Sequence, residues 1–264
     1  MDTRLCGYDE NRRNNGFTLV ELSIVLVIIG LLTSGILLGK DLIRAAELRS
    51  ITSEKDQIQT AVMVFKNKYL GLPGDLRNAT DFWGTMPTGS CPNASDATGT
   101  QTCNGNGDGQ IGHWGPGTNW EELVLWQHLS NAGLIQGKYT GVWSGTLGAA
   151  GQHYASKISN NYWALRFFVG DMPISNPNVF EGRYDHNMEI FGAGTYPLTT
   201  SEAWNIDSKI DDGLAGLGKV VTAEHNGENC NSVAASTTVA LSSTASYNFD
   251  YSSPTCSLIF RNLW

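Results

Sequence analysis

The N-terminal part of the chain shows two consecutive patterns of apolar and polar residues. Residues Leu22 to Gly39 form a run without a charged side chain. A helix of that length covers about 27 Å, close to the hydrocarbon core of a bilayer. Beyond it, apolar residues recur at helical spacing, with Lys55 at the one position that interrupts the series: Leu48, Ile51, Ile58, Val62, Phe65 and Tyr69. The two patterns predict one helix from Phe17 to about Lys68, roughly 78 Å long, apolar all round at first and amphipathic later.

Stop signals and capping patterns predict the remaining helices. The segment Leu70-Gly-Leu-Pro-Gly74 ends the long helix, and a short helical turn is expected over Asp75–Phe82. A helix is predicted over Asn119–Ala132, with Asn119 as N-cap and Glu122 three residues later. Another is predicted over Thr199–Asp212, with a capping box of Thr199 and Glu202 and a stop at Gly213.

Short runs of β-branched and aromatic residues predict strands in the second half of the chain. The segment Leu165–Val169 interrupts its apolar residues with Arg166, which favours a half-buried, antiparallel strand. Tyr247, Phe249 and Tyr251 alternate with polar residues and indicate one more strand near the C-terminus. The other predicted strands are Tyr154–Ile158, Tyr162–Val169, Met188–Gly192, Gly218–Ala223 and Ser257–Leu263. The expected fold is α+β: a long N-terminal helix packed on an antiparallel sheet.

The charge balance argues against nucleic acid as a direct partner. The chain has 264 residues and a formal net charge of −8, and its 17 Lys and Arg form no run beyond Arg12-Arg13. Binding of phosphates needs clustered cations. The region beyond the membrane-length helix is long enough for a well-packed domain.

Four of the five cysteines lie beyond the first helix. Cys6 is near the N-terminus, and the others are Cys91, Cys103, Cys230 and Cys256. An even number of cysteines would indicate disulfides in a domain that lies outside the cytoplasm. Pairing of sequence neighbours gives Cys91–Cys103 and Cys230–Cys256, one of the three connectivities that four cysteines allow. No CxxC pattern occurs, so zinc binding and thiol redox catalysis are disfavoured.

The segment Gly16-Phe-Thr-Leu-Val-Glu21, followed directly by the apolar run, resembles the processing site of type IV prepilins and pseudopilins. A secretory signal peptide differs, because its cleavage site follows the apolar run. A plain membrane anchor is the alternative. The resemblance covers roughly Asn14 to Ser50, and the remainder only in general layout. The region between Cys230 and Cys256 also resembles the disulfide-bounded C-terminal region of many type IV pilins.

This resemblance implies how the chain is processed and where it resides. A prepilin peptidase would cut between Gly16 and Phe17 and methylate the new N-terminus. Glu21, a lone acid at membrane depth, would meet the N-terminal amine of a neighbouring subunit during assembly. The implied parts are a leader at 1–16, a long helix at 17–70 with a transmembrane segment at 17–39, and a periplasmic globular domain at 71–264. The implied partners are other pilin subunits and an inner-membrane assembly platform in a bacterium.

Two acidic regions are candidates for cation binding. Asn104, Asn106 and Asp108 alternate with glycines as in the first half of an EF-hand loop, and Glu122 or Glu121 would supply the missing acidic ligand of a Ca²⁺ site. The alternative is a Gly/Asn-rich turn without metal. Asp207, Asp211 and Asp212 gather at the end of a predicted helix, either as a solvated acidic end or as a cation or subunit contact.

No pattern of residues indicates catalysis. The five histidines have no metal-binding spacing, and GxSxG, P-loop and dinucleotide motifs are absent from the sequence. We therefore expect a filament subunit and not an enzyme. Three hypotheses follow: a type IV pilus subunit, a pseudopilin of a type II secretion system, or a calcium-dependent binding or adhesin module on a pilin anchor.

Overall fold

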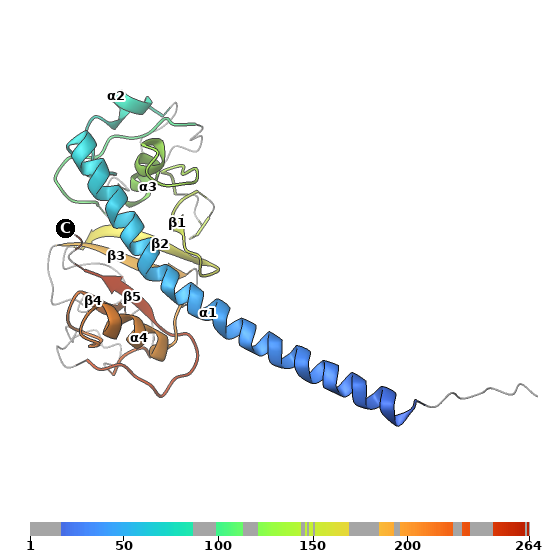
Figure 1. Cartoon of the computed structure of the whole chain (residues 1–264). Helices are drawn as coiled ribbons and strands as arrows, with labels where there is room; N and C mark the ends of the chain where they lie inside the picture. The colour runs from blue at the N-terminus through green and yellow to red at the C-terminus, as the bar shows by residue number, and fades with distance from the viewer. Residues whose placement is uncertain are drawn as a thin grey trace, which may run out of the picture. The chain divides into compact units, whose positions relative to one another are not determined.

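The computed structural model describes residues 17–86, 99–112, 121–143, 146, 148–149, 151–168, 185–192, 196–223, 229–232, 245–261 and 263. The chain divides into two compact units, Met1–Ala46 and Glu47–Trp264. The described elements, labelled in Figure 1, are α1 (Leu19–Tyr69), α2 (Ala79–Trp83), α3 (Glu121–Asn131), β1 (Tyr154–Ala155), β2 (Asn161–Phe168), β3 (Asp185–Gly192), α4 (Thr200–Ile210), β4 (Val220–Ala223) and β5 (Ser257–Phe260).

The first unit contains the N-terminal part of α1, in which every residue from Leu19 to Leu38 is exposed. The hydroxyl groups of Ser23 and Thr33 donate to backbone carbonyls one turn earlier, so they leave no unpaired donor on the apolar surface. By length and composition this helix is suited to crossing a membrane. The predicted helix is confirmed, with ends at Leu19 and Tyr69.

The later part of α1 belongs to the second unit and buries its apolar stripe. Ile51, Ile58, Val62 and Phe65 are all fully buried. Glu54 lies on the same face and is only 2% exposed, although it is a charged residue. Its carboxylate accepts hydrogen bonds from the indole of Trp163 (2.7 Å), the hydroxyl of Ser156 (2.9 Å) and the amide of Lys157 (3.0 Å). These donors take the place of solvating water and so lower the free-energy cost of burying the charged carboxylate.

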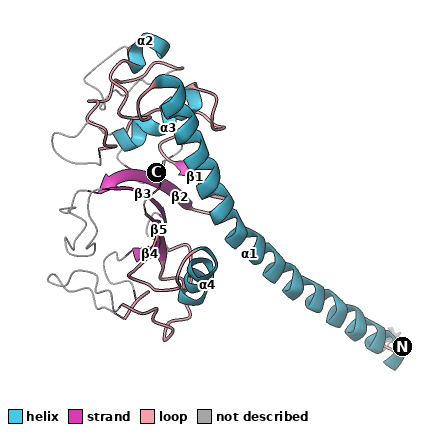
Figure 2. Ribbon diagram, turned by 60° about the vertical axis from the view of Figure 1, so that its left-hand side comes forward, coloured by secondary structure: helices cyan, strands magenta, loops and turns pink. Residues whose placement is uncertain are grey.

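The sheet has five antiparallel strands in the order β1-β2-β3-β5-β4. Strands β2 and β3 pair along their full lengths, from Asn161 with Gly192 to Phe168 with Asp185. Strand β5, from the end of the chain, pairs with β3 on one side and β4 on the other. Figures 1 and 2 show the later part of α1 running beside β2. The predicted α+β architecture with an antiparallel sheet is confirmed.

The half-buried strand predicted around Arg166 is buried on both faces. Leu165 is fully buried, and Arg166 is only 9% exposed. The guanidinium forms an ion pair with Glu189 on β3 and lies 3.6 Å from the carboxylate of Glu122 on α3. Burial of a charge is tolerated when opposite charges surround it. Arg166 therefore links α3 to the sheet and does not mark a solvent face.

Local capping decides where the shorter helices begin and end. The Thr199 side chain accepts the amide of Glu202, and the Glu202 carboxylate accepts the amide of Thr199 (2.9 Å), which confirms the predicted capping box of α4. Gly133 follows α3 with φ +72°, where glycine is favoured. The predicted N-cap Asn119 lies outside the described residues. The helical turn expected from Asp75 begins only at Ala79.

The strand predicted from the alternation of Tyr247, Phe249 and Tyr251 is wrong. Tyr247 forms only an isolated bridge with Asn231, and a turn follows at Phe249 and Asp250. Phe249 packs instead against Trp204 of α4, with ring centroids 6.1 Å apart. The alternation therefore reflects contacts with a helix and not a strand ladder.

Replacement of Glu54 with alanine is expected to destabilise the second unit strongly. The change leaves the buried indole N–H of Trp163 and amide of Lys157 without acceptors, so the free energy of unfolding should fall by about 2–4 kcal/mol. Chemical denaturation of the full chain in detergent, followed by tryptophan fluorescence, measures this. Asp56→Ala, on the exposed face of the same helix, should change it by less than about 0.5 kcal/mol. Equal effects of the two variants would contradict the assigned role of Glu54.

Candidate functional site

The residues at the start of α1 form a compact hydrogen-bonded cap. The amide and hydroxyl of Thr18 each donate to Oε2 of Glu21 at 2.8 Å, and the amide of Glu21 donates to the Thr18 hydroxyl at 3.2 Å. This reciprocal arrangement is a capping box, and it explains why the helix begins at Leu19. The spacing Thr18-x-x-Glu21 is visible in the sequence, yet Thr18 was not singled out there.

The cap fixes where the predicted processing and assembly residues lie. Phe17 precedes the helix and is 90% exposed, while Gly16 lies outside the described residues. Glu21 lies in the first turn, where the positive end of the helix dipole favours a carboxylate. Its side chain is exposed, and within the described residues it accepts hydrogen bonds from Thr18 alone. The arrangement places one acid beside the first residue of the exposed apolar segment.

A second candidate region is the loop at residues 104–112, which wraps around Asp75. The amides of Gly107, Asp108 (3.1 Å) and Gly109 (2.9 Å) all donate to the carboxylate of Asp75. The backbone of Gly105 also approaches Asp75 so closely that a Cβ there would lie 2.3 Å from the Asp75 Cα. The glycines of the sequence motif thus permit close packing of the loop around a buried acid.

Three carboxylates converge on this loop: Asp75, Asp108 and Glu121 offer oxygen atoms within 4.8 Å of one another. Glu121, at the first turn of α3, accepts the amides of Asn106 (2.9 Å) and Gly112 (2.7 Å). Asp75 was absent from the predicted ligand set, because it lies in a distant part of the sequence. These backbone contacts hold the loop in place through the protein's own donors.

The predicted calcium ligands occupy different positions around this cluster. Asn104 accepts the amide of Thr80 at 2.8 Å, and Asn106 hydrogen-bonds to both the side chain and the amide of Asp108. Glu122 lies beside Arg166, whereas its neighbour Glu121 faces the loop. Asp108 and Glu121, both considered in the sequence, are therefore together in space. Calcium binding by this loop stays a prediction.

Burial and mutual repulsion perturb the titration of these acids. Burial, followed by the charges of Asp75 and Asp108, raises the pKa of Glu121 from 4.5 to about 6, against the opposing effect of the amides of Asn106 and Gly112. The pKa of Asp75 is raised as well, mainly by burial, although three loop amides favour its charged form. The cluster therefore holds negative charge at an energetic cost.

The structure contains the predicted disulfide between the two C-terminal cysteines. Cys230 and Cys256 are bonded with S–S 2.02 Å and Cα–Cα 5.0 Å, and they join the segment after β4 to the residue before β5. Cys103 is also disulfide-bonded, whereas its predicted partner Cys91 lies outside the described residues. The cross-link stabilises by restricting the unfolded chain, typically by about 2–4 kcal/mol.

Comparison with known families identifies only the N-terminal segment. Residues 11–37 match the prokaryotic N-terminal methylation motif. The match includes Gly16, Phe17, Glu21 and most of the charge-free run, and it agrees with the resemblance to type IV prepilins and pseudopilins. No curated protein and no solved structure matches the chain.

The raised pKa of Glu121 predicts an unusual pH dependence of stability. The folded chain retains a proton at Glu121 up to about pH 6, whereas in the unfolded chain this carboxyl has its ordinary pKa of 4.5. The folded state therefore binds more protons in this range, and the contribution of Glu121 to stability falls as the pH rises from 4.5 to about 6. Glu121→Gln should make this fall shallower by the part that Glu121 contributes, as measured by denaturation of both proteins across the range. Asp56→Asn should keep it, and parallel curves for wild type and Glu121→Gln would contradict the assignment.

Proposed function

We propose that the chain is the precursor of a type IV pilin-like filament subunit. The observation that carries the proposal is the methylation motif joined without interruption to a helix whose apolar residues are exposed from Leu19 to Leu38. A contiguous apolar surface of this size needs lipid or another protein around it. A membrane supplies this environment before assembly, and a bundle of identical helices supplies it in a filament.

Processing would create the second charge that assembly needs. A prepilin peptidase cuts after Gly16 and methylates the amine of Phe17, which remains cationic. Inside an apolar bundle, an isolated Glu21 carboxylate would be very unfavourable. An ammonium of a neighbouring subunit neutralises it and fixes the axial register. In this chain Thr18 donates twice to Glu21, so the acid is held at the helix start until a partner arrives.

The proposed location and role follow from the same features. The subunit is held in the bacterial inner membrane by residues 17–39, with the globular domain in the periplasm and the Arg12-Arg13 pair on the cytoplasmic side. Its role is structural and not catalytic. Pilins and pseudopilins share the methylation motif, so their distinction rests on experiment. Abundance in sheared surface filaments identifies a major pilus subunit, and a secretion defect on deletion identifies a pseudopilin.

A calcium-binding loop is a second proposal for the globular domain. Its support is the convergence of Asp75, Asp108 and Glu121, whose oxygen atoms suit a hard cation. Such an ion would reinforce a loop that already packs around Asp75. A calcium-dependent rise in melting temperature that is lost in Asp108→Asn would support it.

The mass of the protein from its own host membranes tests the proposed processing. We expect a mature chain that begins at Phe17 and carries one methyl group on its amine. Substitution of Gly16 with a bulky residue should leave the full precursor uncut, because the peptidase site requires a small residue. Substitution of Gly39, beyond the cleavage site, is the matched control and should leave processing normal. A wild-type chain that begins at Met1 would refute the proposal and favour a plain anchor.

Replacement of Glu21 with alanine separates processing from assembly. We expect normal cleavage after Gly16, since the scissile bond is intact, but a loss of filaments of at least about tenfold, because the buried amine lacks its partner. Quantification of sheared filaments together with intact mass measures both effects. Glu47→Ala, far along the same helix, is the control for general damage. Filaments at wild-type yield in Glu21→Ala would contradict the pairing.

A further inference from the structure

Three aspartates meet where α4 ends and the chain turns toward β4. Asp207, Asp211 and Asp212 offer carboxylate oxygen atoms that all lie within 4.8 Å of one another. Asp207 is fully buried, Asp211 is partly buried and Asp212 is exposed. The group thus extends from the interior of the second unit to its surface.

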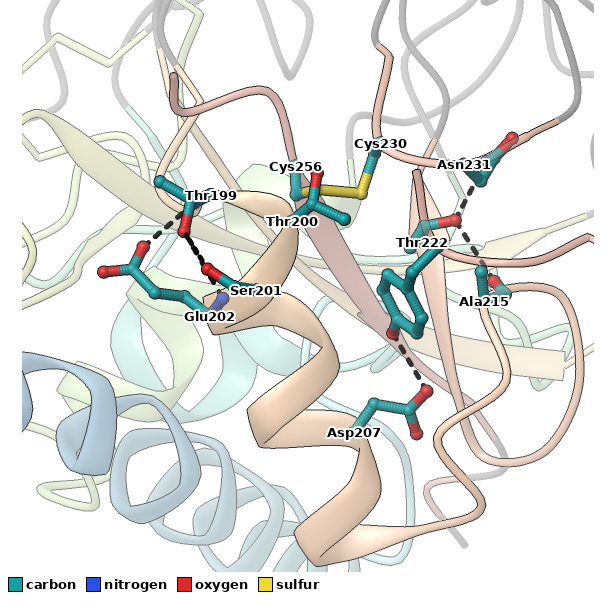
Figure 3. Close-up of a disulfide and its surroundings, with 11 residues drawn as sticks. Thr199, Thr200, Ser201, Glu202, Asp207, Ala215, Thr222, Cys230, Asn231 and Cys256 are labelled. Atoms are coloured by element: carbon teal, nitrogen blue, oxygen red, sulfur yellow. Dashed lines mark hydrogen bonds between the residues drawn. A yellow bond between two sulfur atoms is a disulfide. The ribbon is translucent and has the colours of Figure 1, made fainter. Parts of the chain in front are cut away.

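The fold uses one oxygen atom of each carboxylate. Oδ2 of Asp207 accepts a hydrogen bond from the hydroxyl of Tyr247 at 2.9 Å. Figure 3 shows Asp207 on α4 with this hydrogen bond as a dashed line. Oδ2 of Asp211 accepts the amides of Lys219 and Val220 at the start of β4. Oδ1 of Asp212 accepts the amide of Leu214 at 2.9 Å. In the part of the chain that is described, the second oxygen of each carboxylate accepts no hydrogen bond of ordinary geometry, although the Gly213 amide lies near enough to Asp207 to favour its charged form.

Among these second carboxylate oxygens, that of Asp207 has the most unusual environment. Oδ1 is inaccessible to solvent and has no hydrogen-bond partner among the described residues. A buried oxygen without a donor or a cation costs free energy. None of the described Lys, Arg or His side chains forms a salt bridge with the three aspartates. Arg261, which is near this turn, donates instead to the carbonyl of Gly218 at 3.4 Å.

The electrostatics of the group agree with a missing positive charge. Burial, then the charges of Asp212 and Asp211, raises the pKa of Asp207 from 3.8 to about 6, although the Tyr247 hydroxyl and the Gly213 amide oppose this effect. Most molecules still carry an ionised Asp207 at neutral pH. Up to three negative charges then share a small volume that is partly closed to water.

We propose that Asp207, Asp211 and Asp212 form a binding site for a hard divalent cation, with Ca²⁺ as the ligand. Carboxylate oxygens are the donors that Ca²⁺ prefers, and three of them supply the negative charge that binding requires. Asp207 is buried and Asp212 is exposed, so an ion held between them would lie at the boundary between the interior and solvent. Water completes the coordination on the exposed side.

The bound ion would join three parts of the unit that the sequence separates. Asp207 and Asp211 belong to the end of α4, and Asp211 also caps the start of β4 through two amides. Tyr247 connects Asp207 to the segment between Cys230 and Cys256. The ion therefore stabilises the region around the C-terminal disulfide. This inference is independent of filament assembly.

Terbium luminescence of the full chain in detergent tests the site directly. Tb³⁺ replaces Ca²⁺ at sites formed by oxygen ligands. Tyr247 is hydrogen-bonded to Asp207, so its ring is close enough to transfer excitation energy to a bound Tb³⁺. We expect saturable Tb³⁺ emission that Ca²⁺ competes away after treatment with a chelator. Asp207→Asn and Asp212→Asn should each weaken the affinity by at least about tenfold, because each removes one of three charges.

Two control variants make the result specific. Asp250→Asn removes an exposed acid of the same unit outside the group, and Asp108→Asn alters the other acidic cluster. Both should keep the emission associated with Asp207. Asp212 is exposed, and asparagine at this position retains Oδ1 as acceptor for the Leu214 amide, so Asp212→Asn should fold normally. This variant therefore tests the cation site even if Asp207→Asn does not fold. Affinity of Asp212→Asn equal to that of wild type would overturn the proposal.

Discussion

The second unit depends on the contact between the later part of α1 and the sheet, and the carboxylate of Glu54 is its polar centre. Apolar side chains such as Ile51 and Phe65 supply the area removed from water, but they do not choose a register by themselves. Glu54 does so, because its donors on Trp163, Ser156 and Lys157 come from consecutive parts of the β1–β2 hairpin region. A shift of the helix by one turn would leave a charge and several donors buried without partners.

The two parts of α1 have different environments although they form one continuous helix. From Leu22 to Leu38 all faces are exposed and free of charge, so nothing in the sequence selects one side for packing within this chain. From Ser50 onward one face is buried and the other is charged. The amphipathic stripe was therefore predictable from residue periodicity, and the end near Leu70 from the stop signals that follow it. The membrane assignment rests on the length of the charge-free run together with the methylation motif.

Long-range contacts set the limit of prediction from the sequence. The α4 capping box was predictable because Thr199 and Glu202 are close in sequence. The burial of Arg166 was not, since it depends on Glu122 and Glu189, which come from other elements. For the same reason the acidic loop could be recognised from Asp108, but the contribution of Asp75 and the choice of Glu121 over Glu122 required the folded chain. Local sequence patterns therefore specify the helices and strands, whereas contacts with residues distant in the sequence determine which charged side chains are buried.

The position of β5 has a consequence for the order of events during biosynthesis. This strand follows all the other described strands in the chain, yet it lies between β3 and β4 and joins them into one sheet. Cys256, which closes the disulfide with Cys230, directly precedes it. The sheet is therefore incomplete until β5 has been synthesised, long after α1 has left the ribosome. Until then the strands that β5 joins are open to wrong pairing. A chain that stopped before Ser257 would leave β4 detached from the sheet.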